Sequence, residues 1–416
     1  MKKTYLKKAM CLIMASAAMA CSDVVNIDEG WDDDMGSDGA PVIRKITASS
    51  DTSTVITSAA LNQSIAIFGD NLAYVQEIKV NDISVDLSEI YAKRHRLEMV
   101  IPRVLPGEVN NILYIRTSDG EVTAPLEVVL PELTVSGFSN EFAADGDTVR
   151  VIGTNFDLYQ IDSVNAKVQF NGSDIRIFDC TATSVSLQIP EGTPEDTPSS
   201  LTISTPQVDN PVQVPFRDEG IPILTDDPHT HMKGPWFDGS SCVCLNLADN
   251  PDAEPEAPLF DFYVDVKATA TGSWQYFNVF ITHFYLEESA RDLVNHPEDY
   301  VVKFELYTPS NVPLAKLVKI GFAEDDYGFI YDWDPSATNG GVSLNTMNQW
   351  QTVSLEVTDL FCKDGQCYLK ISESPDPYAG DGAADYNNFK MALNRELAGD
   401  WEFCCWNFRF AKKLEI

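Results

Sequence analysis

An eight-residue pattern indicates the fold class: Ile65-Ala-Ile-Phe-Gly-Asp-Asn-Leu72 has a similar counterpart in Val149-Arg-Val-Ile-Gly-Thr-Asn-Phe156. Alternate residues before the glycine are apolar in both copies, and this period of two is typical of a β-strand that buries one face. Glycine adopts backbone conformations that other residues disfavour, so Gly-x-Asn predicts a turn at the end of that strand. The sequence therefore predicts two related β units.

The similarity between the two units extends beyond this stretch. Each unit opens on a proline, Pro41 or Pro131, and two further segments match: Val80-Asn-Asp82 with Phe170-Asn-Gly172, and Leu97–Pro102 with Val185–Pro190. Short runs of this kind, separated by Gly, Asn and Pro, are typical of a β-sandwich. The repeated pattern resembles the immunoglobulin-like IPT/TIG domain. That resemblance implies two tandem spacer sandwiches, at residues 41–130 and 131–217.

Residues 218–416 follow a proline-rich stretch and form a third region, which is longer than either repeat. Strand patterns continue through it, and only Glu287–Val294 and Lys390–Leu397 are expected to be helical. The closing run Trp406–Phe410 resembles the last strand of many carbohydrate-binding sandwiches. We therefore expect an all-β chain that ends in a larger β-sandwich resembling a carbohydrate-binding module. Proline-rich connections are stiff, so this domain should be held at a fixed angle.

One predicted strand of the last region, from Trp274 to Tyr285, carries aromatic residues on both faces. Period two assigns Phe277, Val279 and Ile281 to the core. The opposite face then carries Trp274, Tyr276, Asn278, Phe280, Thr282 and Phe284. Aromatic rings beside polar groups suit a sugar, whose flat C–H face stacks on a ring while its hydroxyls need hydrogen bonds. A second buried face is the alternative interpretation of the same pattern.

A second aromatic cluster spans Tyr327 to Trp333, with acidic residues beside it. Trp333 lies at the predicted end of a strand, next to a loop, and is the best single candidate for a sugar platform. Tyr331 is its expected partner, and Trp236 is expected to line the same rim. Trp350, at the start of an apolar strand, is predicted to be structural.

The composition narrows the classes of ligand. The chain of 416 residues has 29 basic and 63 acidic residues, a formal net charge of −34. Nucleic acid is a poor partner for such a chain, because binding phosphates needs a basic surface. Electrostatic attachment to a membrane is disfavoured for the same reason. A neutral polymer is compatible with this charge.

The spacing of the cysteines gives little sign of a bound metal or cofactor. The nine cysteines include Cys362 and Cys367, which flank a predicted Asp-Gly turn and could be either bridged or free. The pairs Cys242-x-Cys244 and Cys404-Cys405 lack the spacing that is usual for zinc. We therefore expect no metal and no cofactor.

The N-terminus resembles that of a secreted lipoprotein. Lys2 to Lys8 and an apolar run to Ala20 have the layout of a signal peptide over residues 1–20. Ala18-Met-Ala-Cys21 resembles a lipobox, in which Cys21 becomes the lipidated first residue. Residues 21–40 are acidic and too poor in apolar groups to fold, so they are expected to form a tether.

The whole layout resembles the surface glycan-binding lipoproteins of Sus-like polysaccharide-utilisation systems. The resemblance implies non-catalytic binding of a neutral polysaccharide, with β-glucans such as xyloglucan or mixed-linkage glucan favoured. It also implies a lipid anchor in the outer membrane, facing the exterior, beside an outer-membrane transporter. Two alternatives remain: a surface adhesin or scaffold that binds proteins, and a glycoside hydrolase that uses acidic pairs such as Asp332 and Asp334.

Overall fold

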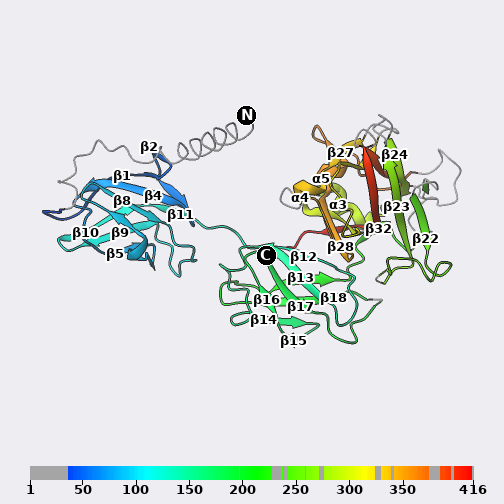
Figure 1. The fold of residues 1–416 in the computed structure, drawn as a ribbon, viewed down its shortest axis with the longest axis horizontal. Helices are drawn as coiled ribbons and strands as arrows, with labels where there is room; N and C mark the ends of the chain where they lie inside the picture. Colours follow the sequence, from blue (N-terminus) through cyan, green and yellow to red (C-terminus); the bar gives the residue numbers. More distant parts are fainter. Residues whose placement is uncertain are drawn as a thin grey trace, which may run out of the picture. The chain divides into compact units, whose positions relative to one another are not determined.

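The computed structural model describes residues 36–195, 197–226, 236–237, 242–257, 259–270, 276–323, 329–338, 342–373, 385–394 and 398–414. The chain divides into two compact units, residues 1–131 and residues 132–416. Strands dominate both units, and the prediction of an all-β chain is confirmed (Figure 1). Within the described residues, no helix is long and apolar enough to span a membrane.

The first unit holds one β-sandwich, called here the first sandwich. One sheet has the order β2-β1-β4-β8-β7 and the other has the order β10-β9-β5-β6, while β3 and β11 form a parallel pair. Its core lies between the sheets and includes Ile65, Ile67 and Ile115. The strands are β1 (Val42–Ala48), β2 (Asp51–Val55), β3 (Ser58–Ala60), β4 (Ser64–Asp70), β5 (Val75–Val80), β6 (Ile83–Ser84), β7 (Tyr91–Ala92), β8 (Arg96–Val100), β9 (Ile112–Thr117), β10 (Gly120–Pro125) and β11 (Glu127–Val129).

The second unit begins with the middle sandwich, which pairs the sheets β12-β13-β17-β16 and β15-β14-β18-β19. Val149 and Val151 of the repeated stretch point into its core, as their alternation predicts. The strands are β12 (Thr134–Phe138), β13 (Thr148–Thr154), β14 (Lys167–Phe170), β15 (Ser173–Ile175), β16 (Asp179–Cys180), β17 (Ser184–Gln188), β18 (Ser199–Ser204) and β19 (Val212–Phe216).

The Gly-x-Asn motif has the same structural basis in both sandwiches, and it differs from our expectation. A Cβ at Gly69 or Gly153 would collide with a backbone carbonyl of the neighbouring first strand, so the glycine permits close approach of two strands. The left-handed turn belongs to the asparagine, with φ of 56° at Asn71 and 62° at Asn155. Each asparagine amide donates to the chain just before the first strand, at 3.2 Å to Ala40 O and 2.8 Å to Glu132 O.

The remainder of the second unit is the C-terminal sandwich, built from two sheets. We call β22-β23-β32-β25-β28 the back sheet, with β20 added beside β32, and β21-β24-β31-β26-β27 the front sheet. The strands are β20 (Ile221–Leu224), β21 (Trp236–Phe237), β22 (Cys242–Asn246), β23 (Phe262–Ala270), β24 (Tyr276–Phe284), β25 (Tyr300–Tyr307), β26 (Val318–Ala323), β27 (Phe329–Trp333), β28 (Trp350–Glu356), β29 (Cys362–Lys363), β30 (Gln366–Cys367), β31 (Asn387–Asn394) and β32 (Gly399–Lys412).

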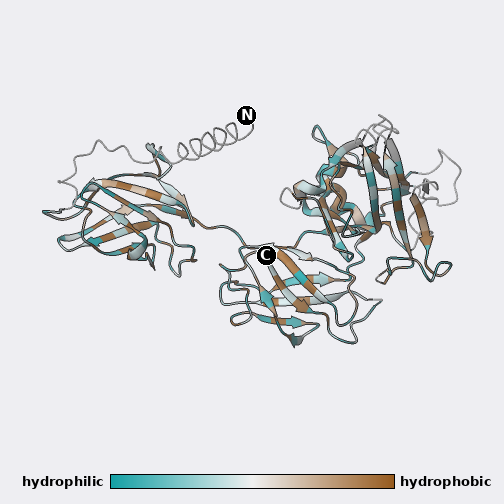
Figure 2. Ribbon diagram, in the orientation of Figure 1, coloured by the Kyte–Doolittle hydropathy of each residue, from teal (hydrophilic) through white to brown (hydrophobic). Residues whose placement is uncertain are grey.

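The α-helices among the described residues of the C-terminal sandwich are few and short. They are α3 (Arg291–Asn295), α4 (Pro335–Thr338) and α5 (Val357–Phe361). The helix expected at Glu287–Val294 overlaps α3, but the one expected at Lys390–Leu397 was wrong, because β31 occupies most of that range. The apolar residues gather along the strands of each sandwich (Figure 2). Between the front and back sheets the core is rich in aromatic rings, including Phe280, Phe304, Phe389 and Phe408.

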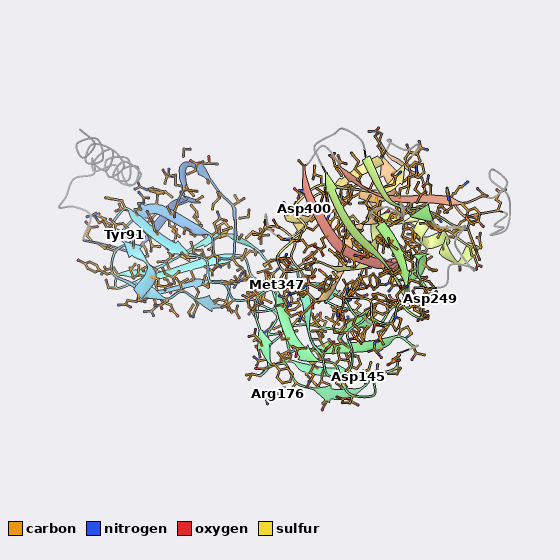
Figure 3. The ribbon with its side chains drawn as sticks, turned by 45° about the vertical axis from the view of Figure 1, so that its right-hand side comes forward. Tyr91, Asp145, Arg176, Asp249, Met347 and Asp400 are labelled. Carbon is orange, nitrogen blue, oxygen red and sulfur yellow. The ribbon has the colours of Figure 1, made fainter. Side chains whose placement is uncertain are left out.

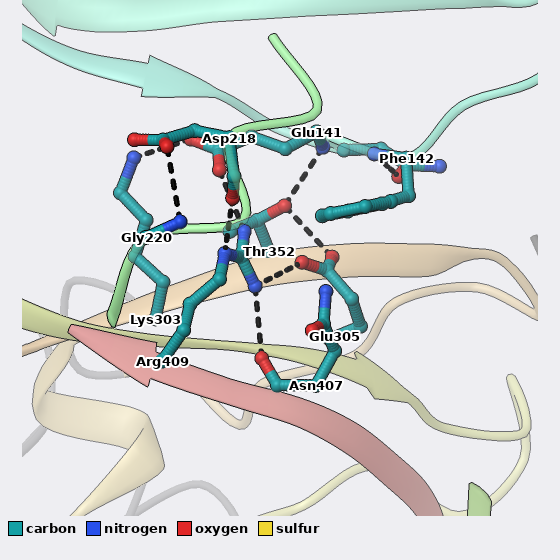
Figure 4. A network of polar contacts seen from close by, with 10 residues as sticks. Glu141, Phe142, Asp218, Gly220, Lys303, Glu305, Thr352, Asn407 and Arg409 are labelled. Atoms are coloured by element: carbon teal, nitrogen blue, oxygen red, sulfur yellow. Dashed lines mark hydrogen bonds and ion pairs between the residues drawn. The ribbon is translucent and has the colours of Figure 1, made fainter. Parts of the chain in front are cut away.

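Buried charges join the middle and C-terminal sandwiches (Figure 4). Glu141, between β12 and β13, accepts a hydrogen bond from Arg409 at 2.6 Å and pairs with Lys303. Arg409 also contacts Glu305 at 3.0 Å, and the Thr352 hydroxyl donates to Glu305 at 2.8 Å. We call these five residues the joint network. Its two cations balance its two carboxylates, so each buried charge has a partner.

The joint network is buried as well as charged. Glu141, Glu305 and Arg409 are each 0% exposed. Burial raises the pKa of the Glu305 carboxyl. Two backbone contacts reinforce the joint: Glu141 N–H donates to Thr352 Oγ1 at 2.8 Å, and Thr352 N–H donates to Ser139 O at 2.9 Å. A polar interface therefore connects the two sandwiches, in addition to the proline-rich stretch.

Candidate functional site

The front sheet has an apolar inner face and a polar outer face. In β24 and β31, Phe280 pairs with Met391 and Thr282 pairs with Phe389, and all four side chains are buried against the back sheet. Residues paired across antiparallel strands point to the same side, so the alternate rows point outward. The outer rows are therefore a separate surface with its own chemistry.

The outer rows bring together polar groups from four strands. Ile281 pairs with Lys390, His283 pairs with Asn388, and Asn278 pairs with Ala392, which in turn pairs with Lys319 of β26. Lys319 pairs with Asp332 of β27, and their side chains form an ion pair at 2.6 Å. We call Asn278, Ile281, His283, Lys319, Asp332, Asn388 and Lys390 the outer face. Amides, ammonium groups and a carboxylate are the groups that exchange hydrogen bonds with sugar hydroxyls.

Two of the predicted platform residues occupy register positions beside the outer face. Trp236 of the edge strand β21 pairs with Ile281, and Tyr276 pairs with Asn394 at the start of β24. Asn278 Oδ1 is buried and has no hydrogen-bond partner among the described residues. Trp274, which we also expected in the site, lies outside the described residues, as does the lipidation candidate Cys21.

The prediction of Trp333 as a surface platform was wrong. Its side chain is 0% exposed, and its ring packs edge-on against Phe304 of the back sheet, with centroids 5.6 Å apart. Register explains this, because Trp333 pairs with the buried Val318 and therefore points inward. Tyr331 pairs with Ile320 on the same inner side and is only half-buried, and burial raises the pKa of its hydroxyl.

The predicted faces of β24 were also wrong. Phe280 and Phe284, which we placed on the sugar side, are 0% exposed, whereas Ile281 is half-buried on the outer face. The register shifts between Asn278 and Phe280, where a β-bulge interrupts the alternation. Strict period two from Trp274 onward therefore assigns the wrong face to every residue after the bulge.

Three other tryptophans of the C-terminal sandwich are buried as well. The indole N–H of Trp350 donates to Glu256 O at 2.8 Å, in agreement with its predicted structural role. Trp406 donates to Asp226 at 2.6 Å, and Lys316 Nζ lies 5.1 Å from the ring centre of Trp401. Every tryptophan whose side chain the structure describes is therefore part of the interior.

Sequence reasoning missed the polar rows of β31. Asn387-Asn-Phe-Lys-Met-Ala-Leu-Asn394 reads as a strand if Phe389, Met391 and Leu393 are taken as one face. The other face then carries Asn388, Lys390 and Asn394. We interpreted part of this segment as a helix instead, so its contribution to the outer face was not predicted.

Other types of site find little support. Among the described residues, no group of three or more His, Cys, Asp or Glu side chains is arranged to hold a metal. A cavity of about 260 Å³ lies on the middle sandwich, lined by residues that include Arg176, Phe178 and Glu191. Arg176 lies at the margin of this sandwich (Figure 3). This cavity is on a different sandwich from the outer face.

Comparisons with solved structures return surface glycan-binding proteins. PbSGBP-B of Prevotella bryantii is 18% identical, covers 91% of this chain and 100% of its own, and has a TM-score of 0.47. SGBP-B from a complex xyloglucan utilization locus of Bacteroides uniformis is 15% identical and has a TM-score of 0.41. That match covers 90% of this chain and 99% of the other. SGBP-B from a Bacteroides ovatus mixed-linkage glucan utilization locus, in complex with a heptasaccharide, is 12% identical and has a TM-score of 0.22. That match covers 88% of this chain and 72% of the other.

Family models assign the two sandwiches of the second unit. A search of curated proteins gave no match. Residues 133–216 match the IPT/TIG domain, and residues 216–412 match the xyloglucan-binding domain of surface glycan-binding protein B. The two matches adjoin, so the second unit consists of an IPT/TIG domain followed by the xyloglucan-binding domain of surface glycan-binding protein B.

Proposed function

We propose that this protein captures a neutral β-glucan, such as xyloglucan or mixed-linkage glucan, at the outer cell surface and does not cleave it. The observation that carries the proposal is the match of residues 216–412 to a xyloglucan-binding domain. The outer face supports it, because the strand register places hydrogen-bonding residues of four strands on one side of the front sheet. An extended surface suits a polymer that continues in both directions beyond the protein.

Trp236, Tyr276 and Trp274 are the residues we propose as stacking platforms. The pairing of Trp236 with Ile281 and of Tyr276 with Asn394 puts their backbone beside the polar rows. The burial of the other tryptophans of the C-terminal sandwich supports this choice by elimination. Stacked rings would supply affinity, while the half-buried Asn388 and the exposed Asp332 would select hydroxyl positions on the sugar.

The binding mechanism predicts weak single sites. A surface groove leaves much of the sugar hydrated, and association costs several kcal/mol of lost freedom, so we expect a Kd of roughly micromolar to millimolar. Many copies on one membrane that grip one polymer would strengthen retention through effective concentration. The acidic chain further favours neutral over polyanionic glycans.

We further propose that Cys21 carries the lipid that attaches the protein to the outer membrane, beside an outer-membrane transporter. The charge of −34 disfavours electrostatic attachment to anionic lipids and supports a covalent anchor. Labelling cells with a radioactive fatty acid tests this. The wild-type chain should incorporate label and Cys21→Ser should not, whereas equal labelling of both would contradict the anchor.

Affinity electrophoresis tests the proposed function. The full chain should be retarded in native gels that contain xyloglucan or mixed-linkage glucan, and should run unretarded in gels that contain polygalacturonate. Reducing-sugar release from the same glucans would support a hydrolase instead. Absence of retardation by every neutral glucan would contradict the proposal, and would leave a protein-binding scaffold as the better interpretation.

A further inference from the structure

A tight β-hairpin follows helix α5 and carries a cysteine on each strand. β29 and β30 are joined by Asp364 and Gly365, whose φ angles of 53° and 81° are both left-handed. Two such residues make the type I′ turn that closes two-residue hairpins. Cys362 lies directly opposite Cys367 in this hairpin. Among the described residues, this is the one place where two cysteines are paired in register.

The position of the cysteines in the ladder suits a covalent bond. Lys363 pairs with Gln366 next to the turn, and on the far side Tyr368 N–H donates to Phe361 O at 2.9 Å. Hydrogen-bonded and non-hydrogen-bonded pairs alternate along an antiparallel ladder, so Cys362 and Cys367 form the non-hydrogen-bonded pair between them. Such pairs have Cα atoms about 4.5 Å apart, inside the range of roughly 4.4–6.8 Å that disulfides require.

The two thiols already interact. Burial raises the pKa of the Cys362 thiol to about 12, and its hydrogen bond with the Cys367 thiol acts in the same direction. Both side chains are half-buried, whereas Cys180 is exposed and Cys242, Cys404 and Cys405 are buried. Forming a bond between Cys362 and Cys367 therefore requires only that their sulfur atoms approach.

We propose that Cys362 and Cys367 form a cross-strand disulfide in the exported protein. Each thiol loses its hydrogen and an Sγ–Sγ bond forms, so the pair gives up two protons and two electrons. A thiol oxidant that carries its own disulfide, as is typical of export compartments, accepts both electrons and becomes a dithiol. The raised pKa of Cys362 disfavours the reactive thiolate once the hairpin is packed. The exchange is therefore expected while the chain is still folding.

The disulfide would brace one end of the front sheet. Beyond the hairpin, Lys370 N–H donates to Asn387 Oδ1 at 2.9 Å, and Ser372 N–H donates to Leu286 O at 2.9 Å. Tyr368 also stacks on Phe322, with ring centroids 4.3 Å apart. The segment from Tyr368 to Ser372 thus contacts β26, β31 and the chain just after β24. A covalent hairpin would fix the point from which this segment starts.

Thiol trapping tests the proposal on the full chain. Cells that export the protein are divided into two samples. One is lysed directly in excess N-ethylmaleimide, and the other is reduced first and then treated with it. The tryptic peptides of both samples are then mapped. Cys362 and Cys367 should be alkylated only after reduction, and a linked peptide lighter by two hydrogen atoms should disappear on reduction. Cys180 is exposed and provides the internal control, because it should be alkylated in both samples. Free Cys362 and Cys367 without reduction, or a link from either one to another cysteine, would overturn the proposal.

A matched set of variants adds a second readout. Reductant should lower the unfolding midpoint of the wild-type protein by roughly 3–8 °C. The Cys362→Ser/Cys367→Ser double variant should unfold at that lower temperature and should not respond to reductant. Cys180→Ser should behave like the wild type. A wild-type midpoint that does not change on reduction would overturn the proposal, and this readout is independent of glycan binding.

Discussion

The two sheets of the C-terminal sandwich share one aromatic core but use their outer sides in different ways. The back sheet turns Lys303, Glu305 and Arg409 toward the middle sandwich, where Glu141 completes a buried and balanced set of charges. The front sheet carries the Lys319–Asp332 ion pair away from the core, and Trp236 and Tyr276 pair in its register with Ile281 and Asn394. Similar residue types therefore hold two domains together on one side and form a candidate ligand surface on the other.

In the joint network, buried charges pair across the contact between two sandwiches. Replacing a buried ion pair with apolar groups is often neutral, whereas removing one member leaves an uncompensated charge. The joint network thus fixes how the middle sandwich meets the C-terminal sandwich. The outer face of the front sheet, whose Asp332 side chain is 50% exposed, has no such partner domain among the described residues.

The largest effect is expected from the back sheet. Glu141→Ala leaves Arg409 and Lys303 buried with only Glu305 to balance them, and should lower the free energy of unfolding of the second unit by about 3–5 kcal/mol. Urea unfolding followed by tryptophan fluorescence measures this loss. Glu191→Ala, an exposed carboxylate on the same sandwich, is the control and should change stability by less than about 0.5 kcal/mol. Equal effects of the two substitutions would contradict the role given to the joint network.

The next largest loss of stability is expected from a substitution in the core that the two sheets share. Trp333→Ala removes a fully buried ring and should cost about 3–5 kcal/mol of unfolding free energy. Trp333→Phe keeps an aromatic ring and should cost less. Because Trp333 points away from the outer face, the phenylalanine variant should bind glucan as tightly as the wild type. Loss of binding by a stably folded Trp333→Phe protein would restore the residue to the ligand site.

Substitution at the edge of the front sheet should separate binding from stability. Trp236→Ala removes a proposed stacking ring and should weaken glucan binding by about 3- to 10-fold, because a stacked pair contributes about 0.5–1.5 kcal/mol. The unfolding midpoint should stay within about 2 °C of wild type. Affinity electrophoresis and thermal unfolding measure the two quantities. Lost stability with unchanged binding would assign Trp236 to the interior.

The smallest effect is expected for the exposed ion pair of the outer face. Asp332→Asn removes the partner of Lys319 and should change the free energy of unfolding by less than about 1 kcal/mol. Any change in glucan affinity beyond about two-fold would then come from lost contacts to the sugar. Calorimetry on the folded variant measures that difference. An equally large effect on stability would contradict the surface role of this pair.

Much of the fold could be predicted from the sequence, because short-range patterns specify it. The repeated Gly-x-Asn stretch indicated two related sandwiches, although the glycine and asparagine divide their roles differently from our expectation. The candidate site was harder to predict, because a single bulge near Asn278 reverses the faces of β24. Glu141 and Arg409 are 268 residues apart, and a single sequence gives no sign that they meet.

Titration calorimetry with xyloglucan oligosaccharides is the most direct test of glucan capture by the front sheet. The wild-type full chain should bind with a Kd between about 1 μM and 1 mM. The Trp236→Ala/Trp274→Ala double variant should bind about 10- to 100-fold more weakly and keep the wild-type unfolding midpoint. Undiminished binding by the folded double variant would contradict the account.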